Sequence, residues 1–346
     1  METVLLYLLF AVGVVLIVKG GDWFVDGAAW VAEVTGLPKF IIGATIVSVA
    51  TTLPEIIVSA MAAVEGHEIL ISGIANAQAL AQEKVGMAIG NGVGSVICNT
   101  AMIMAFSLVF MPTGIDRRKF SPKAVFLGIA VVALFALTFN GSLTSKASIV
   151  LIAVFVAYIA ENIKSAKTDV KEDFDDDKPK ADKKTITKNV FYIVAGAACI
   201  VFGSRLLVNY GGEIARSWGV SEAIIGVTMV AIGTSLPELV TAVTAVIKKQ
   251  PSMSVGNVIG ANVIDIALIL PICSLIYGGV LPVSVQNIYL DFPVCILVSV
   301  IALVPTIIAG KFRRWQGVVM LAFYIAYLVV VSTKLDWYLG LFNVAV

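Results

Sequence analysis

Two stretches of the chain decide its architecture: Gly36–Glu55, GLPKFIIGATIVSVATTLPE, and Gly219–Glu238, GVSEAIIGVTMVAIGTSLPE. They align without a gap at an offset of 183 residues, and each ends in Leu-Pro-Glu within an apolar run. A second motif follows each copy: Met87–Asn99, MAIGNGVGSVICN, matches Met253–Asp265, MSVGNVIGANVID, at an offset of 166. The first copy therefore has 17 extra residues between its motifs, which we expect to form an outside loop containing His67. Internal repeats in a strongly apolar chain are typical of transporters.

The composition places the chain in a membrane. Of its 346 residues, 59% are hydrophobic and 14% are charged, and the mean hydropathy of +0.97 is far above that of soluble domains. A net charge of +1, from 24 basic and 23 acidic residues, provides no polycationic face for a nucleic acid. The four cysteines are scattered without a Cys-x-x-Cys pair, so we predict neither a zinc site nor a disulfide framework. The expected partner is the lipid bilayer, and no obligatory protein partner is inferred.

The apolar runs predict the topology. A helix needs about 20 apolar residues to cross a bilayer, and we predict an all-α polytopic membrane protein with ten transmembrane helices. The predicted spans are 3–29, 40–63, 86–110, 122–139, 146–163, 188–209, 222–247, 252–277, 288–309 and 315–334. With the N-terminus outside, 18 of the 24 basic residues fall in inside loops, where Lys and Arg concentrate. We therefore expect an integral protein of the cell (inner) membrane with both termini outside. The first apolar run lacks the basic flank and cleavage site of a secretory signal, so we expect it to remain as a helix.

One polar segment separates the two copies. Residues 164–188 are rich in lysine and contain the acidic run Glu172–Asp177, so we predict a cytoplasmic linker there. The first repeat is then 1–163, with helices 1–5, and the second is 189–346, with helices 6–10. The acidic run offers an alternative as a regulatory cation site, although it lacks the glycine and closing glutamate of a calcium loop.

The direction of the two copies predicts their symmetry. The span that holds Glu55 runs from inside to outside, whereas the span that holds Glu238 runs from outside to inside. We therefore predict two inverted-topology five-helix repeats, whose matching motifs meet near the bilayer midplane.

The carboxylates of Glu55, Glu238 and Asp265 lie inside predicted spans, within the repeated motifs. Each costs about 2.5–3.5 kcal/mol on the insertion scale, and a bound cation would offset that cost. The alternatives are pairing with Lys19 or Arg205, or protonation. Helical spacing puts further oxygen-bearing positions on the same face. These are Ser48 and Thr51 before Glu55, Ala231 and Thr234 before Glu238, and Thr52 and Ser235 beside them.

The two prolines add backbone oxygens. Pro54 and Pro237 remove a backbone donor, so we expect kinks that free the carbonyls of Ala50 and Gly233. Oxygen ligands suit calcium, or sodium at lower charge, while the absence of histidine and thiolate at the motifs argues against zinc and copper.

The glycine-asparagine motifs predict packing as well as polar groups. Gly90 with Gly94, and Gly256 with Gly260, have the spacing of close helix packing. We expect Asn91 and Asn257 to tie broken-helix backbone together, with ion binding as the alternative. The polar pairs that follow are Ser95 with Asn99 in the first copy and Ala261 with Asp265 in the second.

Together, the segments GATIVSVATTLPE and GVTMVAIGTSLPE, followed by GNGVGSVICN and GNVIGANVID, resemble the two alpha-repeats of the cation/calcium exchanger superfamily, in particular its prokaryotic sodium/calcium exchanger branch. The resemblance covers essentially the whole chain. It implies an electrogenic antiporter that exchanges sodium for calcium by alternating access and extrudes calcium. Calcium and sodium are then transported ions, and no cofactor or catalytic residue is expected.

Carried over residue by residue, the resemblance implies a ligand set. Glu55 and Glu238 become the carboxylates shared by both ions, and Thr51 and Thr234 become calcium ligands. The remaining implied ligands are Thr52, Ser235, Ser95, Asn99 and Asp265, with the backbone carbonyls of Ser48 and Ala231 at flanking sodium positions.

The chain departs from the family pattern at a few positions. Ala261 stands where serine is usual, so one sodium position loses a hydroxyl; Ser48 stands where alanine is common, Ala50 replaces glycine and Thr52 replaces serine. These departures leave sodium dependence less secure than cation binding.

Rival functions remain open at this point. A calcium/proton exchanger is the nearest, because a buried carboxylate also carries a proton; potassium cotransport and a cation channel are others. An enzyme is not expected. His67-Glu68 begins like the zinc motif HExxH but lacks its second histidine, and no Walker A loop occurs.

Overall fold

The computed structural model describes residues 2–112, 114–172, 182–218 and 235–342. In these residues the chain is helical, except for one two-stranded antiparallel sheet of three residues a strand. The contacts divide the chain into two compact units. Unit 1 contains Met1–Thr51 and Asn162–Gly260, and unit 2 contains Thr52–Glu161 and Ala261–Val346. Each unit takes elements from both predicted repeats, so this division by contacts does not test the division into repeats.

Unit 1 is built around two long helices. Its elements are α1 (Glu2–Thr35), α2 (Lys39–Ile42), the π-helix η1 (Gly43–Val47), α3 (Ser48–Thr51), α9 (Lys183–Ser217), α11 (Leu236–Ile247) and most of α12 (Pro251–Ile264). Phe24 and Val25 of α1, Ile200 of α9 and Met253 of α12 meet in one buried cluster. With 34 and 35 residues, α1 and α9 are each about 50 Å long, well beyond the roughly 30 Å hydrocarbon core of a bilayer.

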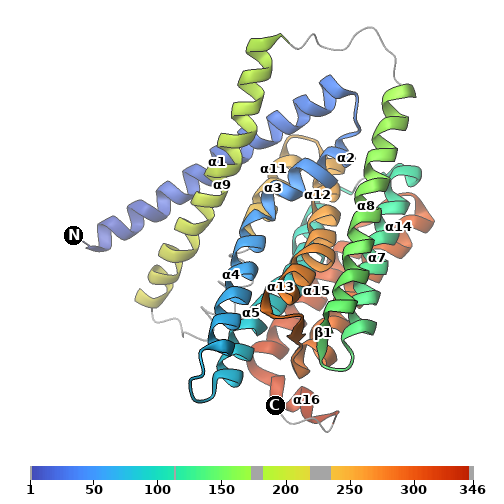
Figure 1. Ribbon diagram of the computed structural model, residues 1–346. Coiled ribbons are helices and arrows are strands. Elements are labelled where there is room, and N and C mark those ends of the chain that lie inside the picture. The colour runs from blue at the N-terminus through green and yellow to red at the C-terminus, as the bar shows by residue number, and fades with distance from the viewer. Residues whose placement is uncertain (1, 113, 173–181, 219–234, 343–346) are drawn as a thin grey trace. The chain divides into compact units, whose positions relative to one another are not determined.

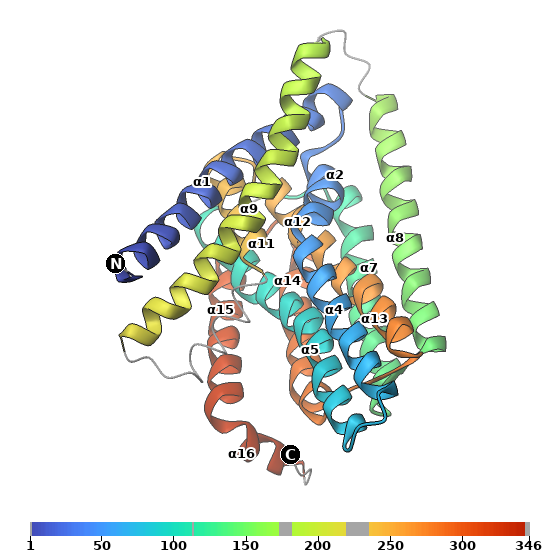
Figure 2. The same ribbon diagram turned by 60° about the vertical axis from the view of Figure 1, so that its left-hand side comes forward.

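Glycines bring α1 and α9 together where the two helices cross (Figures 1 and 2). A Cβ on Gly13 would lie 3.0 Å from the carbonyl oxygen of Gly203, and a Cβ on Gly203 would lie 2.8 Å from that of Gly13. Gly20 and Gly196 face each other in the same reciprocal way, at 2.8 Å in both directions. The repeat offset matches Gly13 to Gly196 and Gly20 to Gly203. Exchanging each glycine for its counterpart therefore turns the Gly13–Gly203 contact into the Gly196–Gly20 contact, as a two-fold relation between the helices would.

Unit 2 contains the remaining elements. The first are α4 (Leu53–Ile71), α5 (Ala77–Cys98), η2 (Asn99–Met104), α6 (Ala105–Phe110), α7 (Arg117–Thr138), β1 (Ser142–Thr144) and the greater part of α8 (Ser145–Glu172). The others are η3 (Asp265–Ile269), α13 (Leu270–Tyr277), β2 (Val280–Pro282), η4 (Asn287–Asp291), α14 (Phe292–Ala309), α15 (Arg314–Val329), η5 (Val330–Lys334) and α16 (Leu335–Gly340). The strands pair at Leu143 and Leu281, and the Ser274 hydroxyl donates to the Leu143 carbonyl at 2.8 Å. This small sheet departs from the all-α prediction, as does an isolated antiparallel bridge between Gly114 and Lys311.

The structure supports most of the predicted spans. Among the described residues, eight helices are long and apolar enough to cross a membrane, and a ninth span is formed if the bent pair Lys39–Thr51 and Leu53–Ile71 counts as one. Of the predicted span 222–247, residues 222–234 lie outside the described residues, and the rest contains α11. The chain is thus an integral membrane protein with multiple apolar helices.

The predicted outside loop around His67 is wrong. Instead α4 continues to Ile71 and α5 begins at Ala77, nine residues before the predicted span. His67 lies on α4, where its Nδ1 is 3.1 Å from the Tyr277 carbonyl oxygen. The extensions stabilise each other, because Lys84 and Glu65 form an ion pair at 3.3 Å and a Cβ on Gly66 would lie 3.2 Å from the Ala81 carbonyl. A similar lengthening carries α8 to Glu172 and starts α9 at Lys183, so helices enter both ends of the predicted linker 164–188.

Candidate ion-binding site

A helix begins at the same place in both Leu-Pro-Glu motifs. Between α3 and α4 the helix axis bends by 45°, and the residue at the bend is Thr52, with φ −82° and ψ −2°. Ser235, its counterpart in the second copy, precedes α11 with φ −86° and ψ 8°. A proline follows two residues later in each copy, within the first two positions of the new helix. The predicted kink at Pro54 is confirmed; Gly233, whose carbonyl Pro237 was expected to free, lies outside the described residues.

Each of the two helices begins with a buried glutamate. Glu55 lies in the first turn of α4 and Glu238 in the first turn of α11, and each residue is 1% exposed. The positive end of a helix dipole stabilises a carboxylate in the first turn. The two helix starts therefore offer matched positions for a negative charge.

In unit 1, polar side chains surround the end of α3. The Thr51 hydroxyl lies 3.2 Å from Oδ1 of Asn257 and 3.3 Å from the Ser48 carbonyl oxygen. The helix α12 approaches closely, because a Cβ on Gly260 would lie 2.5 Å from the Ser48 Oγ. On the other side α11, which carries Glu238, packs against α3. Unit 1 thus gathers Ser48, Thr51 and the helix of Glu238.

In unit 2, Asn91 of α5 ties down the start of α4. Its Nδ2 donates to the Ser59 hydroxyl at 2.8 Å and to the backbone carbonyl of Glu55 at 3.4 Å. Asn91 thus contacts backbone just after the break, as predicted, whereas Asn257 contacts a side chain just before it. Ser95 follows Asn91 one helical turn later and is also buried.

A chain of amides orients Asn99. Its Nδ2 donates to Oδ1 of Asn262 at 3.1 Å, and the Asn262 Nδ2 donates in turn to the Thr100 hydroxyl at 2.8 Å. With its donor engaged in this way, the buried Asn99 keeps its Oδ1 as an acceptor that has no hydrogen-bond partner among the described residues. A buried carbonyl oxygen of this kind is a natural cation ligand, since an unsatisfied acceptor is costly.

The π-helices mark the second pair of matched residues. In the first copy η2 begins at Asn99, and in the second copy η3 begins at Asp265, its counterpart at the offset of 166. Single π-helical turns inside α-helices are frequent at functional sites. Asp265 is fully buried, and η3 packs against both α4 and α5. Unit 2 therefore brings Asp265 to the helices that carry Glu55 and Ser95.

The described residues of the predicted set are buried without exception. They are Ser48, Thr51, Thr52, Glu55, Ser95, Asn99, Ser235, Glu238 and Asp265, while Ala231 and Thr234 lie outside the described residues. In the part of the chain that the structure describes, no three His, Cys, Asp or Glu side chains cluster as a metal site. Six of the nine described residues of the set carry a hydroxyl or an amide, and three carry a carboxylate.

The predicted glycine packing is confirmed in the second copy. A Cβ on Gly256 would collide with the Phe40 carbonyl oxygen, and one on Gly260 would meet Ala44 and Ser48. In the first copy a Cβ on Gly90 or Gly94 meets no described atom within 4 Å. The repeat counterparts of Phe40 and Ala44 fall in 219–234, outside the described residues, so close packing at Gly90 and Gly94 stays a prediction.

The sequence reasoning missed two polar groups. Asn262 precedes Asp265 by three residues, and nothing in the pattern marked it as the partner of Asn99. Asp291 is buried at the start of the predicted span 288–309, where the rule that found the other acids would have found it. Its carboxylate accepts hydrogen bonds from Asn287 at 2.7 Å and from the Tyr327 hydroxyl at 3.0 Å. These neutral donors join η4 to α15 and give Asp291 a structural role.

Comparison with known proteins identifies the family. The model of the family described as "sodium/calcium exchanger protein" matches residues 5–164 and 188–333. The chain belongs to the sodium/calcium exchanger family. This is a family of transporters rather than of catalytic enzymes, and the resemblance seen in the motifs is confirmed.

Relatives of the exchanger family align over nearly the whole chain. An uncharacterised membrane protein of Methanocaldococcus jannaschii is 29% identical over 91% of this chain and 94% of its own length. The sodium/calcium exchanger MaX1 of Methanosarcina acetivorans is also 29% identical, over 94% of this chain and 97% of its own. Among solved structures, the sodium-calcium exchanger NCX_Mj, soaked with Na+ and Sr2+, superposes with a TM-score of 0.77. It is 28% identical, and the match covers 95% of this chain and 99% of that one.

Proposed function

We propose that this member of the family exchanges sodium for calcium across the membrane by alternating access. The observation that carries the proposal is the pair of matched helix starts, each of which holds a buried glutamate in its first turn. Family membership supplies the ions, and helix starts that carry buried carboxylates are the kind of site at which transporters bind ions.

The proposed ligands are the predicted ones. Glu55 and Glu238 bind both ions, Thr51 and Thr234 complete the calcium site, and Asn99 and Asp265 contribute from the second motifs. Thr52, Ser235 and Ser95, with the carbonyls of Ser48 and Ala231, serve flanking sodium positions. The burial of the described members and the amide chain that orients Asn99 Oδ1 support this assignment. Calcium takes six to eight oxygens, which is more than the carboxylates alone provide.

The proposed topology is ten spans in two inverted five-helix repeats. The reciprocal contacts of Gly13 with Gly203 and of Gly20 with Gly196 support it, because a two-fold relation between α1 and α9 produces such pairs. The family model matches on either side of residues 165–187, which supports a linker there. We place this linker in the cytoplasm and both termini outside, in the inner membrane, as the distribution of basic residues indicates.

The proposed mechanism is competition for shared oxygens. Because both ions need Glu55 and Glu238, the site holds calcium or sodium but not both, and only a loaded site reorients between the two faces. The glycine crossing of α1 and α9 lets these helices move against the rest during reorientation. An inward sodium gradient then drives calcium out of the cell, and the exchange carries net charge.

The test is calcium uptake into proteoliposomes loaded with sodium, repeated with choline, with potassium present or absent, and under a pH gradient. We expect uptake to require the outward sodium gradient, to accelerate when the membrane potential assists charge movement, and to vanish in Glu238→Gln. The matched control is Glu65→Gln, which removes an exposed, ion-paired carboxylate on α4 and should leave uptake unchanged. Uptake that ignores sodium but follows the pH gradient would make the protein a calcium/proton exchanger, and single-channel currents would make it a channel.

A further inference from the structure

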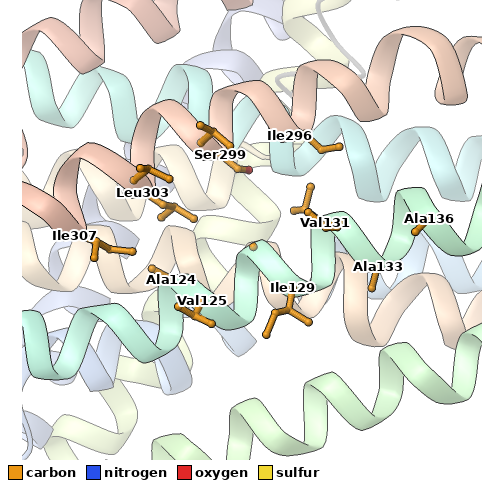
Figure 3. A pocket seen from close by; sticks show the side chains of 14 residues that line it. Ala124, Val125, Ile129, Val131, Ala133, Ala136, Ile296, Ser299, Leu303 and Ile307 are labelled. Carbon is orange, nitrogen blue, oxygen red and sulfur yellow. The ribbon is translucent and has the colours of Figure 1, made fainter.

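A long apolar groove runs between α7 and α14 in unit 2. Its volume is about 550 Å³. Figure 3 shows Ala124 and Val131 of α7 facing Ile307 and Ile296 of α14 across it. The lining extends along α7 from Ala124 to Ala136, which corresponds to roughly 18 Å along the helix axis. Both helices are candidate membrane spans, so the groove lies in the hydrocarbon region.

The lining is open and almost free of polar atoms. A Cβ on Gly128, in the middle of the α7 face, would meet no described atom within 4 Å. The Ser299 hydroxyl is the lining's side-chain polar group; all other lining residues are Ala, Gly, Val, Ile or Leu. Such a surface has no means of recognising a polar solute and suits a hydrocarbon chain.

A basic cluster stands at one end of this groove. It consists of Arg117 and Arg118 at the start of α7 and Lys311, Arg313 and Arg314 after the end of α14, and each of these residues is exposed. In the segments 114–123 and 308–318 the sequence contains seven basic residues but one acid, Asp116. Trp315, 47% exposed, stands beside the cluster, as is usual for aromatic side chains at a membrane-water interface.

Backbone contacts hold the basic cluster against the groove. Gly114 forms an antiparallel bridge with Lys311, and the Ile115 N–H donates to the Gly310 carbonyl at 3.1 Å. The Arg117 guanidinium donates to the carbonyl of Ile308, the residue after the groove-lining Ile307. Below the bridge, Phe120 and Phe312 pack edge to face at 5.5 Å. These contacts therefore hold the basic cluster next to the end of the groove.

We propose that this surface binds an anionic phospholipid, with an acyl chain in the α7–α14 groove and the phosphate at the basic cluster. The open, apolar lining favours a hydrocarbon chain, and the basic cluster at its end supplies the charge that a lipid phosphate needs. Charge favours an anionic lipid, because basic pockets between transmembrane helices bind such headgroups.

Selectivity for the headgroup should come from the basic cluster rather than from the groove. An acyl chain leaves one apolar environment for another when it enters the groove, so only packing contacts are gained there. Each cation near the phosphate should increase the affinity for an anionic lipid about fivefold by electrostatic attraction. Changes in the basic cluster should therefore alter the preference between headgroups, whereas changes in the groove should alter the affinity for every phospholipid.

The experiment titrates the full-length protein in detergent with dioleoylphosphatidylglycerol or dioleoylphosphatidylcholine and counts bound lipids by native mass spectrometry. We expect tighter binding of the anionic lipid to the unmodified protein. The double variant Arg118→Gln/Arg314→Gln should weaken the binding of phosphatidylglycerol roughly fivefold per charge and leave the binding of phosphatidylcholine unchanged. Its control, Lys84→Gln/Lys146→Gln, removes two exposed cations elsewhere in unit 2 and should change neither lipid.

The groove is tested by filling it. Gly128→Leu should weaken the binding of both lipids. The control is Gly86→Leu, at a glycine of α5 whose Cβ would also meet open space, and it should weaken the binding of neither lipid. Equal affinity of the two lipids for the unmodified protein, or equal lipid binding by the two leucine variants, would overturn the proposal. Loss of a dimer in Gly128→Leu alone would identify a second copy of the chain as the occupant instead. Because the arginine variant changes exposed side chains only, it tests the headgroup site even if Gly128→Leu does not fold.

Discussion

The two copies of the motif pair share a backbone plan but carry different polar side chains. In both copies a hydroxyl residue stands just before the start of a helix and a glutamate follows it in the first turn, at Thr52 and Glu55 or Ser235 and Glu238. Around this common plan, Ser48, Ser59 and Ser95 of the first copy correspond to Ala231, Ala242 and Ala261 of the second. The second copy compensates with a charge, because Asp265 stands where the first copy has Asn99.

The shared and unshared groups suggest different roles. The glutamates and the helix starts are duplicated, as expected for groups that serve both ions and both orientations. The hydroxyls of Ser48 and Ser95 and the carboxylate of Asp265 are not duplicated, which suits flanking positions that distinguish sodium from calcium. Substitutions of the shared residues test the common plan, and exchanges of the unshared residues test the division of roles.

The largest effect is expected where the copies agree. Glu55→Gln and Glu238→Gln should each reduce sodium-dependent calcium uptake by at least a hundredfold, because each removes a charge that both ions share. Proteoliposome uptake measures this loss, and size-exclusion profiles check folding. Substantial uptake in one variant alone would mean that the two glutamates are not equivalent and that the symmetric site is wrong.

A smaller effect is expected where charge is not duplicated. Asp265→Asn should raise the calcium concentration that half-saturates uptake by roughly tenfold or more. Interactions of charged groups contribute about 1.5–3 kcal/mol, and this variant removes the charge. Asn99→Asp added to Asp265→Asn restores the charge and should recover part of the affinity. The control is Asp291→Asn, at an equally buried acid in a span that neutral donors already surround. An unchanged calcium affinity in Asp265→Asn would remove Asp265 from the site.

The sequence predicts those features of the site that arise from the local chemistry of the motif and not those that arise from tertiary packing. The kink at Pro54 and the first-turn position of Glu55 follow from the missing proline donor, so the motif alone predicts them. The partners of Asn99 and Asn91 do not follow, because Asn262 and Ser59 reach them only through tertiary packing. The apolar pattern also failed at 64–85, where polar residues suggested a loop but Glu65 and Lys84 extend two paired helices.

A gain of function is expected from the missing hydroxyl. Ala261 is fully buried and corresponds to Ser95 of the first copy. Ala261→Ser should lower the sodium concentration that half-inhibits calcium uptake on the order of fivefold, the value of one net hydrogen-bond-strength interaction. Ala267→Ser, at a fully buried alanine two residues beyond Asp265, is the matched control and should not change sodium competition. Equal shifts in both variants would show that any added hydroxyl acts, and the flanking sodium position would lose its support.

The smallest effect concerns stability rather than transport. Ser59 accepts the 2.8 Å hydrogen bond from Asn91, and its counterpart in the second copy, Ala242, has no side-chain oxygen. Ser59→Ala should lower the free energy of unfolding by about 1 kcal/mol, because the buried Asn91 amide keeps only its longer bond to the Glu55 carbonyl. Ser72→Ala, which removes an exposed hydroxyl at the end of the same helix, should change stability by less than about 0.5 kcal/mol. Denaturation of the two purified variants in one detergent measures the difference. If Ser59→Ala instead abolished exchange without loss of stability, Ser59 would act on the ions, and the first copy would hold a ligand that the second lacks.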